Sequence, residues 1–351
     1  MLSSFHKEAL QTEQNHSHKN TAIDEQLNIS TAESMQARLG QGVQYLQADV
    51  RTLLSELESV GTTLSITRNQ HAIHEVIGRY ENQRIIPNGH SGVILNPGAL
   101  DLRLFFNQFG HVFSLEEPGS TSPKYSIHFY DTQGHGVHEV HCINETDKTA
   151  WLAVIKKYAT ETPGATHISA EKPNQTPPQK TFEPSNELIQ EIEMQWRAMD
   201  DVHQFFKLLN QYGVKRTQLF HAVKNQDLAR RVKNTALISL LEASSQEQNN
   251  IMIFVPNRAC TQIFTGAIEY VMLTPQHPWM TASNSTFRLH LNINAITESW
   301  ITRKNTKDGF VTSLEVFDAN GDQIVQLFGQ RAEGQHEQKQ WRRQTFSLSS
   351  Y

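Results

Sequence analysis

Cysteine is scarce in this chain: only Cys142 and Cys260 occur among its 351 residues, and no C-x-x-C pair is present. A zinc site built from several thiolates, a dithiol redox pair and a cofactor attached through two cysteines are therefore excluded. Long apolar runs are missing as well, because no segment approaches the ~20 consecutive apolar residues that a membrane-spanning helix needs. We therefore expect no membrane span.

The chain also has little excess charge and no recognisable export signal. Its 31 Lys and Arg against 36 Asp and Glu give a net charge of −5, which argues against a nucleic-acid-binding protein because phosphate neutralisation needs a basic surface. The N-terminus lacks the basic start, apolar stretch and cleavage site of a secretory signal. We expect a cytoplasmic protein without a disulfide. Its 17 histidines stand out, since histidine serves metal ligation and proton transfer.

The first half changes from a helical to a strand-like pattern. Apolar residues at three- and four-residue spacing predict helices between about 5 and 60. Between about 63 and 142, short segments rich in Val, Ile, Phe and Tyr alternate with turn residues and predict an antiparallel sheet. A helix is expected at 148–158, and five prolines then mark 161–184 as an exposed linker.

After the linker the same order recurs, with helical patterns between about 186 and 243, strand-like segments between 251 and 329, and a short helix around Trp341. Individual residues align at nearly constant separations. The pairs are Asn69 with Asn257 and Gly78 with Gly266 (188 residues apart), Arg103 with Arg288 (185), Asp131 with Asp318 and Gly134 with Gly321 (187), and Trp151 with Trp341 (190). Such an ordered set indicates an internal duplication.

The duplication predicts an α+β protein with an N-terminal repeat at 1–160, a Pro-rich linker at 161–184 and a C-terminal repeat at 185–351. Duplicated units tend to meet around a pseudo-twofold axis, and clefts between such units are favoured ligand sites. We therefore expect a ligand between the halves.

One histidine interrupts an apolar pattern at the start of the second half. The apolar stripe of the first helix expected there runs through Ile192, Trp196, Met199 and Phe206, and His203 lies in the same line. A neutral imidazole between Met and Phe neighbours suits a haem iron ligand. The pattern leaves open the alternative of a partly buried histidine satisfied by one hydrogen bond.

Other patterns are weaker. His135, His138 and His141 recur every third residue, but alternate side chains of a strand point to opposite faces, so the three cannot converge on one metal. The G-x-G pairs lack the strand-to-helix context of a dinucleotide loop, and no G-x-S-x-G elbow occurs. Nucleotide binding and hydrolase chemistry have no support.

Several long segments resemble the HemS/ChuS family of bacterial haem-transport and haemin-degrading proteins: GRYENQ, ILNPGALDLRLFFNQ, WRAMDDVHQFFKLL, NNIMIFVPNRACTQIFTG and ESWITRKNTKDGFVTSLEVFDANGDQI. The resemblance covers nearly the whole chain apart from the first thirty or so residues and the linker. It implies a duplicated fold in which two stacked antiparallel sheets are flanked by helices. It also implies that haem b binds noncovalently between the halves, in the cytoplasm, after uptake across the envelope.

The same resemblance implies roles for individual residues. The iron ligand falls on His203 in DVHQFF, and a distal arginine, the candidate catalytic residue, falls on Arg103 in LDLRLFF. Haem offers a broad apolar face and two carboxylates, so it needs aromatic walls and cations at its rim. The resemblance implies propionate contacts at Arg216, Lys304, Gln326 and Arg331, and aromatic residues of the cavity at Phe105 and Phe206. Phe328 stands where the family has a tyrosine, so the hydroxyl of that tyrosine is lost. His74 in HAIHE matches a histidine proposed in some relatives to ligate haem in the first half.

Three functions remain open at this point. The first is a haem carrier that passes haem on or opens its ring as a haem oxygenase does, with electrons from an external donor because no segment resembles a flavin or iron–sulfur site. The second is a non-enzymatic chaperone or storage protein that delivers haem to a separate oxygenase. The third, a scaffold that has lost haem, is disfavoured by the presence of His203 and Arg103. The implied partners are an inner-membrane haem importer and a downstream haem oxygenase or reductase.

Overall fold

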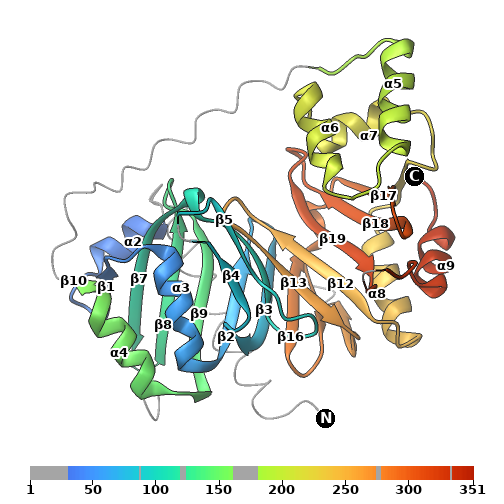
Figure 1. Ribbon diagram of the computed structural model, residues 1–351. Coiled ribbons are helices and arrows are strands. Elements are labelled where there is room, and N and C mark those ends of the chain that lie inside the picture. Colours follow the sequence, from blue (N-terminus) through green and yellow to red (C-terminus); the bar gives the residue numbers. More distant parts are fainter. Residues whose placement is uncertain (1–30, 87, 119–123, 161–180, 274–277, 333) are drawn as a thin grey trace.

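The computed structural model describes residues 31–351 except 87, 119–123, 161–180, 274–277 and 333. Its strands form two antiparallel sheets (Figure 1). Sheet A has the order β10 (Ala159–Thr160), β1 (Val43–Leu46), β7 (Phe109–Glu117), β8 (Lys124–Asp131), β9 (Gly136–Thr146), β2 (Gly61–Arg68), β3 (Ala72–Arg79), β16 (Phe287–Asn292), β15 (Trp279–Ser283) and β14 (Tyr270–Leu273). Sheet B has the order β11 (Ala229–Val232), β17 (Glu298–Thr306), β18 (Gly309–Phe317), β19 (Gln323–Gly329), β12 (Ile251–Pro256), β13 (Cys260–Gly266), β6 (Asp101–Phe105), β5 (Ser91–Ile94) and β4 (Gln83–Ile85). The α+β fold with two antiparallel sheets is confirmed.

The two halves exchange strands. The hairpins β4–β6 of the first half join sheet B, where β6 pairs with β13, and β14–β16 of the second half join sheet A, where β16 pairs with β3. Neither sheet is therefore built from one repeat alone. The sequence predicted the duplication but not this exchange, because the local pattern of a strand does not name its partner.

Paired asparagines hold the crossing point between the halves. Asn69 donates from Nδ2 to the Pro256 carbonyl (3.1 Å), and Asn257 donates in the same way to the Arg68 carbonyl (2.8 Å). Each side-chain oxygen also accepts two backbone N–H groups of its own turn. Buried backbone carbonyls need such donors, which explains why both repeats carry Asn at this position.

The apolar core lies between the sheets. Strand residues alternate, so that Ile253, Val255 and Leu327 of sheet B are fully buried and face Leu289 and other buried residues of sheet A within one cluster. Hydrogen bonds also cross this layer, as Thr67 donates to Gln262 Oε1 at 2.9 Å. The opposite face of each sheet points outward.

Helices flank the sheets. The helices are α2 (Thr31–Ala37), α3 (Val50–Glu56), α4 (Lys148–Tyr158), α5 (Asn186–Arg197), α6 (Gln204–Tyr212), α7 (Arg216–Ala222), α8 (Ala236–Gln246) and α9 (Lys339–Ser347), with short 3-10 turns at Leu57–Val60, Phe106–Gln108 and Ile293–Ala295. Helices α5, α6 and α7 form a separate small layer over one end of sheet B (Figure 1). Their cluster, with Trp196, Phe205 and Phe220 at its centre, packs on Trp300 and Phe317 of the sheet. No helix in the described ranges has the length and apolar character to cross a membrane.

Two helical predictions were wrong in detail. The stretch between about 5 and 60 contains strand β1 between α2 and α3, and its first part lies outside the described residues. The single helix expected at the start of the second half is broken between α5 and α6. The break falls at two aspartates: the Asp201 carboxylate accepts the backbone N–H of His203 (2.7 Å), which competes with helical hydrogen bonding.

Candidate functional site

The register of sheet B brings several candidate residues to one face. Direct cross-strand partners share a face, and one row of such partners runs Trp300, Glu315, Gln326, Phe254, Ile263 and Asp101. Trp300 packs under helices α5–α7, so the row lies on the outer face of sheet B. Arg103 and Phe105 follow Asp101 at two-residue steps, and Phe328 follows Gln326, so all three share this face.

Aromatic side chains form an open surface on this face. Phe254 and Phe328 pack edge to face with their centroids 5.0 Å apart. Phe105, at the end of β6, is 41% exposed. Exposed aromatic groups on one sheet face are typical of a ligand surface and not of a solvent-facing strand. The Phe328 ring keeps the flat apolar surface that a family tyrosine would provide, without a hydroxyl.

His203 lies on the helical layer above this face. It is the N-cap of α6, its side chain is 83% exposed, and its Nδ1 lies 2.7 Å from Asp201 Oδ1. The alternative of a partly buried histidine is thus wrong, as is its expected place in a continuous apolar stripe. Hydrogen bonds from the His203 backbone and ring lower the pKa of Asp201. A carboxylate at Nδ1 favours the tautomer with the proton on Nδ1, which leaves the Nε2 lone pair free for a metal.

Phe206 and Arg216 extend the helical side of the site. Phe206, one turn beyond His203, is 54% exposed, and the Arg216 guanidinium carbon lies 5.0 Å from the centre of its ring. Arg216, at the start of α7, also donates to Glu315 Oε2 at 2.9 Å. The apolar ring and the cation therefore border the same opening.

Lys304 lies deeper than the resemblance implied. Its side chain is 4% exposed, and Nζ donates to Glu315 Oε1 and to Thr302 Oγ1, both at 2.7 Å. Burial lowers the pKa of Lys304, and the adjacent Glu315 partly opposes that shift. The expectation of a rim cation at Lys304 is corrected by the structure, because strand alternation in β17 turns this side chain under the helical layer.

The remaining polar candidates lie along the sheet. Arg103 forms an ion pair with Asp101, whose pKa is raised because burial outweighs the effect of the arginine. Gln326 Nε2 lies 3.4 Å from Ser313 Oγ, and Arg331 Nη1 lies 4.0 Å from Asp308 Oδ2. Arg103 comes from the first half, and strand exchange places it on β6 in sheet B, on the same outer face as the second-half candidates.

His74 is separate from this group. It lies on β3 in sheet A, its side chain is fully buried between the sheets, and it packs edge to face on Phe287. Neither ring nitrogen has a hydrogen-bond partner in the described part of the chain. Burial lowers the pKa of His74 to about 3, so it is neutral. The structure gives this histidine no open surface on which haem could lie.

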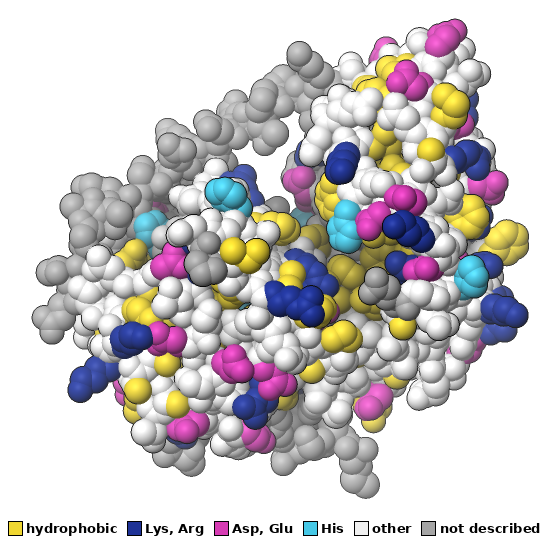
Figure 2. Space-filling view, viewed as in Figure 1, with side chains coloured by type: hydrophobic (Ala, Val, Ile, Leu, Met, Phe, Trp, Pro, Cys, Tyr) yellow, Lys and Arg dark blue, Asp and Glu magenta, His cyan; other side chains and the backbone are white. Residues whose placement is uncertain are grey.

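Figure 2 shows a hollow between the strands and the small helical layer. Hydrophobic side chains lie within it, and Lys or Arg and His side chains lie along its border. An apolar hollow with a few charged groups at its edge suits a ligand that is mostly flat and apolar but carries charge at one side.

Known proteins match this chain over most of its length. The chain matches the model of the haemin-degrading HemS.ChuX domain over residues 28–158 and again over 213–348. It is 49% identical over 322 residues to the hemin transport protein HmuS of Yersinia pestis, covering 92% of this chain and 90% of the relative. It is also 49% identical over 325 residues to the hemin transport protein HemS of Yersinia enterocolitica, covering 92% and 91%.

The chain belongs to this family. Among solved structures it is similar to the heme degrading enzyme ChuS of Escherichia coli O157:H7, with a TM-score of 0.85, 42% identity and 97% of both chains covered. It is similar also to holo-PhuS, a heme-binding protein of Pseudomonas aeruginosa, with a TM-score of 0.85, 29% identity and 97% of both chains covered. The two matches to the family model confirm the duplication expected from the sequence.

Sequence reasoning missed three residues of this candidate site. Phe254 packs against Phe328 on the outer face of sheet B, Asp201 is hydrogen-bonded to His203, and Glu315 forms ion pairs with Arg216 and Lys304. The signal for Asp201 was present, since a carboxylate two residues before a candidate ligand can reach it. Phe254 and Glu315 carry no such local signal, because their position depends on strand pairing.

Proposed function

We propose that this protein binds one haem b noncovalently on the outer face of sheet B, with His203 as the iron ligand. It receives haem in the cytoplasm after import and hands it on or opens its ring. The observation that carries the proposal is the exposed His203, with Nδ1 held by Asp201 and Nε2 free, beside an open aromatic sheet face. Metal-bound histidines usually donate their other ring nitrogen to a carboxylate or carbonyl.

The other residues fit the same ligand. Phe105, Phe206, Phe254 and Phe328 offer flat apolar contacts to a porphyrin. Arg216 is a partly exposed cation for a propionate, since a charge-assisted pair with a guanidinium is geometrically specific. Arg331 and Gln326 would add polar contacts to a propionate.

Arg103 would act as a charged hydrogen-bond donor beside the bound haem. Haem supplies the redox-active iron, and reducing electrons would come from an external donor. A guanidinium in this position stabilises negative charge that develops during the reaction. Its ion pair with Asp101 positions it on the sheet.

The names of the relatives support haem handling by either route, since they describe both transport and degradation. We favour a carrier that is able to open the ring, with a non-enzymatic chaperone that delivers haem to a separate oxygenase as the alternative. The importer and an oxygenase or reductase are the proposed partners. Haem-loaded protein incubated with ascorbate or NAD(P)H and catalase separates the two, because only the first forms an open tetrapyrrole.

A haem titration of His203→Ala tests the binding site. We expect a weakened and displaced Soret band, because the iron loses its protein ligand. His135→Ala is a matched control: His135 is 63% exposed and its Nδ1 also lies near a carboxylate, Asp131 Oδ2 (3.4 Å), but it belongs to the turn between β8 and β9 of sheet A. A His203→Ala protein with the affinity and spectrum of the wild type, or an equal effect in the control, would contradict the assignment.

A further inference from the structure

One edge of strand β17 holds the segment that carries His203. This edge pairs with β11 only as far as Thr302, although β17 itself runs to Thr306. The backbone groups at the end of the edge therefore need other partners. In the structure those partners come from residues 196–203, here called the ligand segment, which contain the end of α5 and the break before α6.

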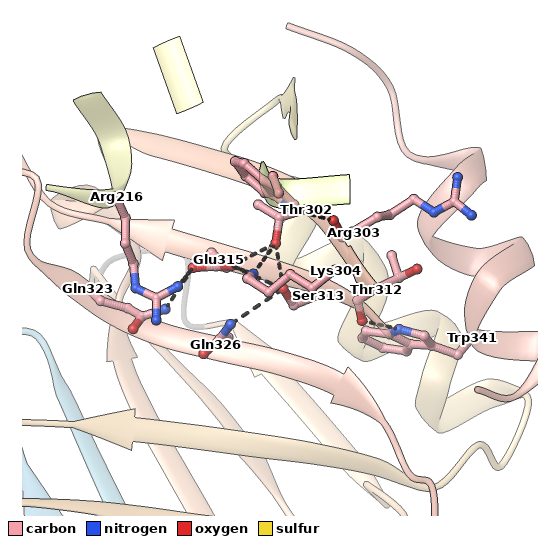
Figure 3. A network of polar contacts seen from close by, with 11 residues as sticks. Arg216, Thr302, Arg303, Lys304, Thr312, Ser313, Glu315, Gln323, Gln326 and Trp341 are labelled. Carbon is pink, nitrogen blue, oxygen red and sulfur yellow. Dashed lines mark hydrogen bonds and ion pairs between the residues drawn. The ribbon is translucent and has the colours of Figure 1, made fainter. Parts of the chain in front are cut away.

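Three hydrogen bonds at two-residue steps of the strand join the ligand segment to this edge. They run from the Trp196 indole Nε1 to the Arg303 carbonyl (2.8 Å), from Asn305 Nδ2 to the Arg197 carbonyl (2.5 Å) and from the Lys307 backbone N–H to the Asp200 carbonyl (3.0 Å). Figure 3 shows Arg303 with its side chain directed away from Glu315, so its backbone and not its charge meets the ligand segment. The last carbonyls of a helix lack partners within the helix, and Asn305 supplies one at the end of α5.

The His203 ring depends on this segment for its position. Its side chain is 83% exposed, and among the described residues its ring is hydrogen-bonded only to Asp201, which belongs to the same segment. Asp200 is bonded in turn to Gln204 at the start of α6, through its backbone N–H (3.0 Å) and its carboxylate (2.6 Å). The ring therefore moves with the ligand segment. A metal ligand must be held within about 0.5 Å of its productive place, so the anchors of the segment matter for iron binding.

We propose that Asn305 and the backbone N–H of Lys307 are positioning groups for the iron ligand. They hold the ligand segment on the β17 edge, so that His203 stands beside the aromatic face of sheet B before haem binds. This inference rests on the proposed haem function. Both groups act on haem only through the backbone of the segment. A loosened segment samples other places, and the affinity falls in proportion to the fraction that has His203 in position.

Matched variants isolate the two side-chain and backbone bonds. Asn305→Ala removes the first, and its control is Asn234→Ala, because Asn234 Nδ2 also donates to a backbone carbonyl, that of Ile296 just before β17 (2.9 Å). Lys307→Pro removes the second, and its reference is Lys307→Ala, which loses the same charge but keeps the N–H. Lys307 follows the last residue of β17 in the turn before β18 and has a negative φ, and proline is favoured at the first central position of such a turn.

Two measurements report on the ligand. A Soret titration gives the haem affinity, and the iron–imidazole stretching band in the resonance Raman spectrum of the ferrous haem-loaded protein shows how uniformly His203 meets the iron. Asn305→Ala should weaken haem binding about fivefold, the size expected for one net hydrogen bond, and broaden the band. Lys307→Pro should bind haem about fivefold more weakly than Lys307→Ala does. Asn234→Ala should match the wild type.

A second arm asks whether the effect passes through His203. In His203→Gly the iron ligand can be replaced by imidazole from the solution, which is not attached to the ligand segment. In that background Asn305→Ala and Lys307→Pro should no longer weaken haem binding. Thermal unfolding of the haem-free proteins checks that each variant folds. If Lys307→Pro does not fold, the comparison of Asn305→Ala with Asn234→Ala decides alone.

Two results would overturn the inference. One is the affinity and band of the wild type in Asn305→Ala, with equal affinities for the two Lys307 variants, because the segment would then need no anchor. The other is the same loss in Asn234→Ala, or in the His203→Gly background with imidazole, since the residues would then support the fold and not the ligand. Failure of the haem function itself looks different: the wild type then binds no haem, or His203→Gly without imidazole has the affinity and band of the wild type.

Discussion

Substitution of Asp201 tests whether its hydrogen bonds orient the His203 ring and fix its tautomer for iron binding. Its Oδ1 accepts both the backbone N–H and the ring Nδ1 of His203, each at 2.7 Å, and the imidazole is otherwise 83% exposed. Asp201→Ala removes both bonds, so the ring samples other rotamers and loses its fixed tautomer. Such supporting groups typically contribute 10–100-fold to metal affinity. Asp201 is itself 56% exposed, which weakens its electrostatic effect, so we expect the low end, about tenfold weaker haem binding.

A graded pair of variants separates orientation from charge. Asp201→Asn keeps an acceptor oxygen for the backbone and ring N–H groups but loses the negative charge, so it should weaken haem binding less than Asp201→Ala does. Both are measured by Soret titration, with circular dichroism to check α6. If Asp201→Ala binds haem as tightly as the wild type, the Nδ1 hydrogen bond does not prepare the ligand, and the argument from tautomer fails.

Two further predictions follow from Arg103 and from the buried histidines. Arg103→Ala should leave His203 ligation intact but move the alkaline transition of the ferric haem-loaded protein to higher pH, because a cationic donor that favours the charged hydroxide-bound form is lost. If the absorption spectrum and its pH dependence matched those of the wild type, Arg103 would only hold its strand in place. The fully buried His74 and His138 have pKa values lowered to about 3 by burial, so the unfolded chain takes up protons below about pH 6.5 while the fold does not. The free energy of unfolding should therefore fall as the pH drops from 7 to 5, by about 2 kcal/mol for each such histidine. His74→Leu should reduce this loss by that amount in denaturant titrations and leave haem binding unchanged, and an unaltered pH dependence would refute the neutral buried state.

The sequence predicted the local elements and the duplication well, because both depend on periodicity and on residue pairs within the chain. It did not predict which strands exchange, since the pattern of β6 is equally consistent with either sheet. Arg103 illustrates the consequence. Its residue type and motif pointed to the site, but its place on the outer face of sheet B follows from the pairing of β6 with β13.

The sequence also could not predict how deeply a charged side chain is buried. Lys304 in a strand and Arg216 at the start of a helix were both expected at the edge of the site, yet one lies buried beside Glu315 and the other borders the opening. The difference arises from strand alternation in β17 and from the covering helices α5–α7. The same limit applies to His203: its motif was informative, but the apolar stripe that supported it is absent because Asp201 interrupts the helix.

The duplicated fold offers two outer sheet faces, and the pairing register explains why they differ in chemistry. Glu315 pairs with Gln326 in sheet B as His128 pairs with Glu139 in sheet A, and Ser313 pairs with Phe328 as Ser126 pairs with His141. All four equivalences have the separation of 187 residues found for Asp131 and Asp318. Where sheet B has a phenylalanine and a glutamine, sheet A has a histidine and a glutamate, which forms an ion pair with Arg68 and lies beside the imidazoles of His128 and His141. An apolar ligand therefore meets the aromatic rings of Phe254 and Phe328 on the outer face of sheet B, whereas at the positions of sheet A equivalent to Gln326 and Phe328 it meets an ion-paired glutamate and a histidine. Because the halves exchange strands, Arg103 of the first repeat joins this face of sheet B, so residues of both repeats make up the candidate site.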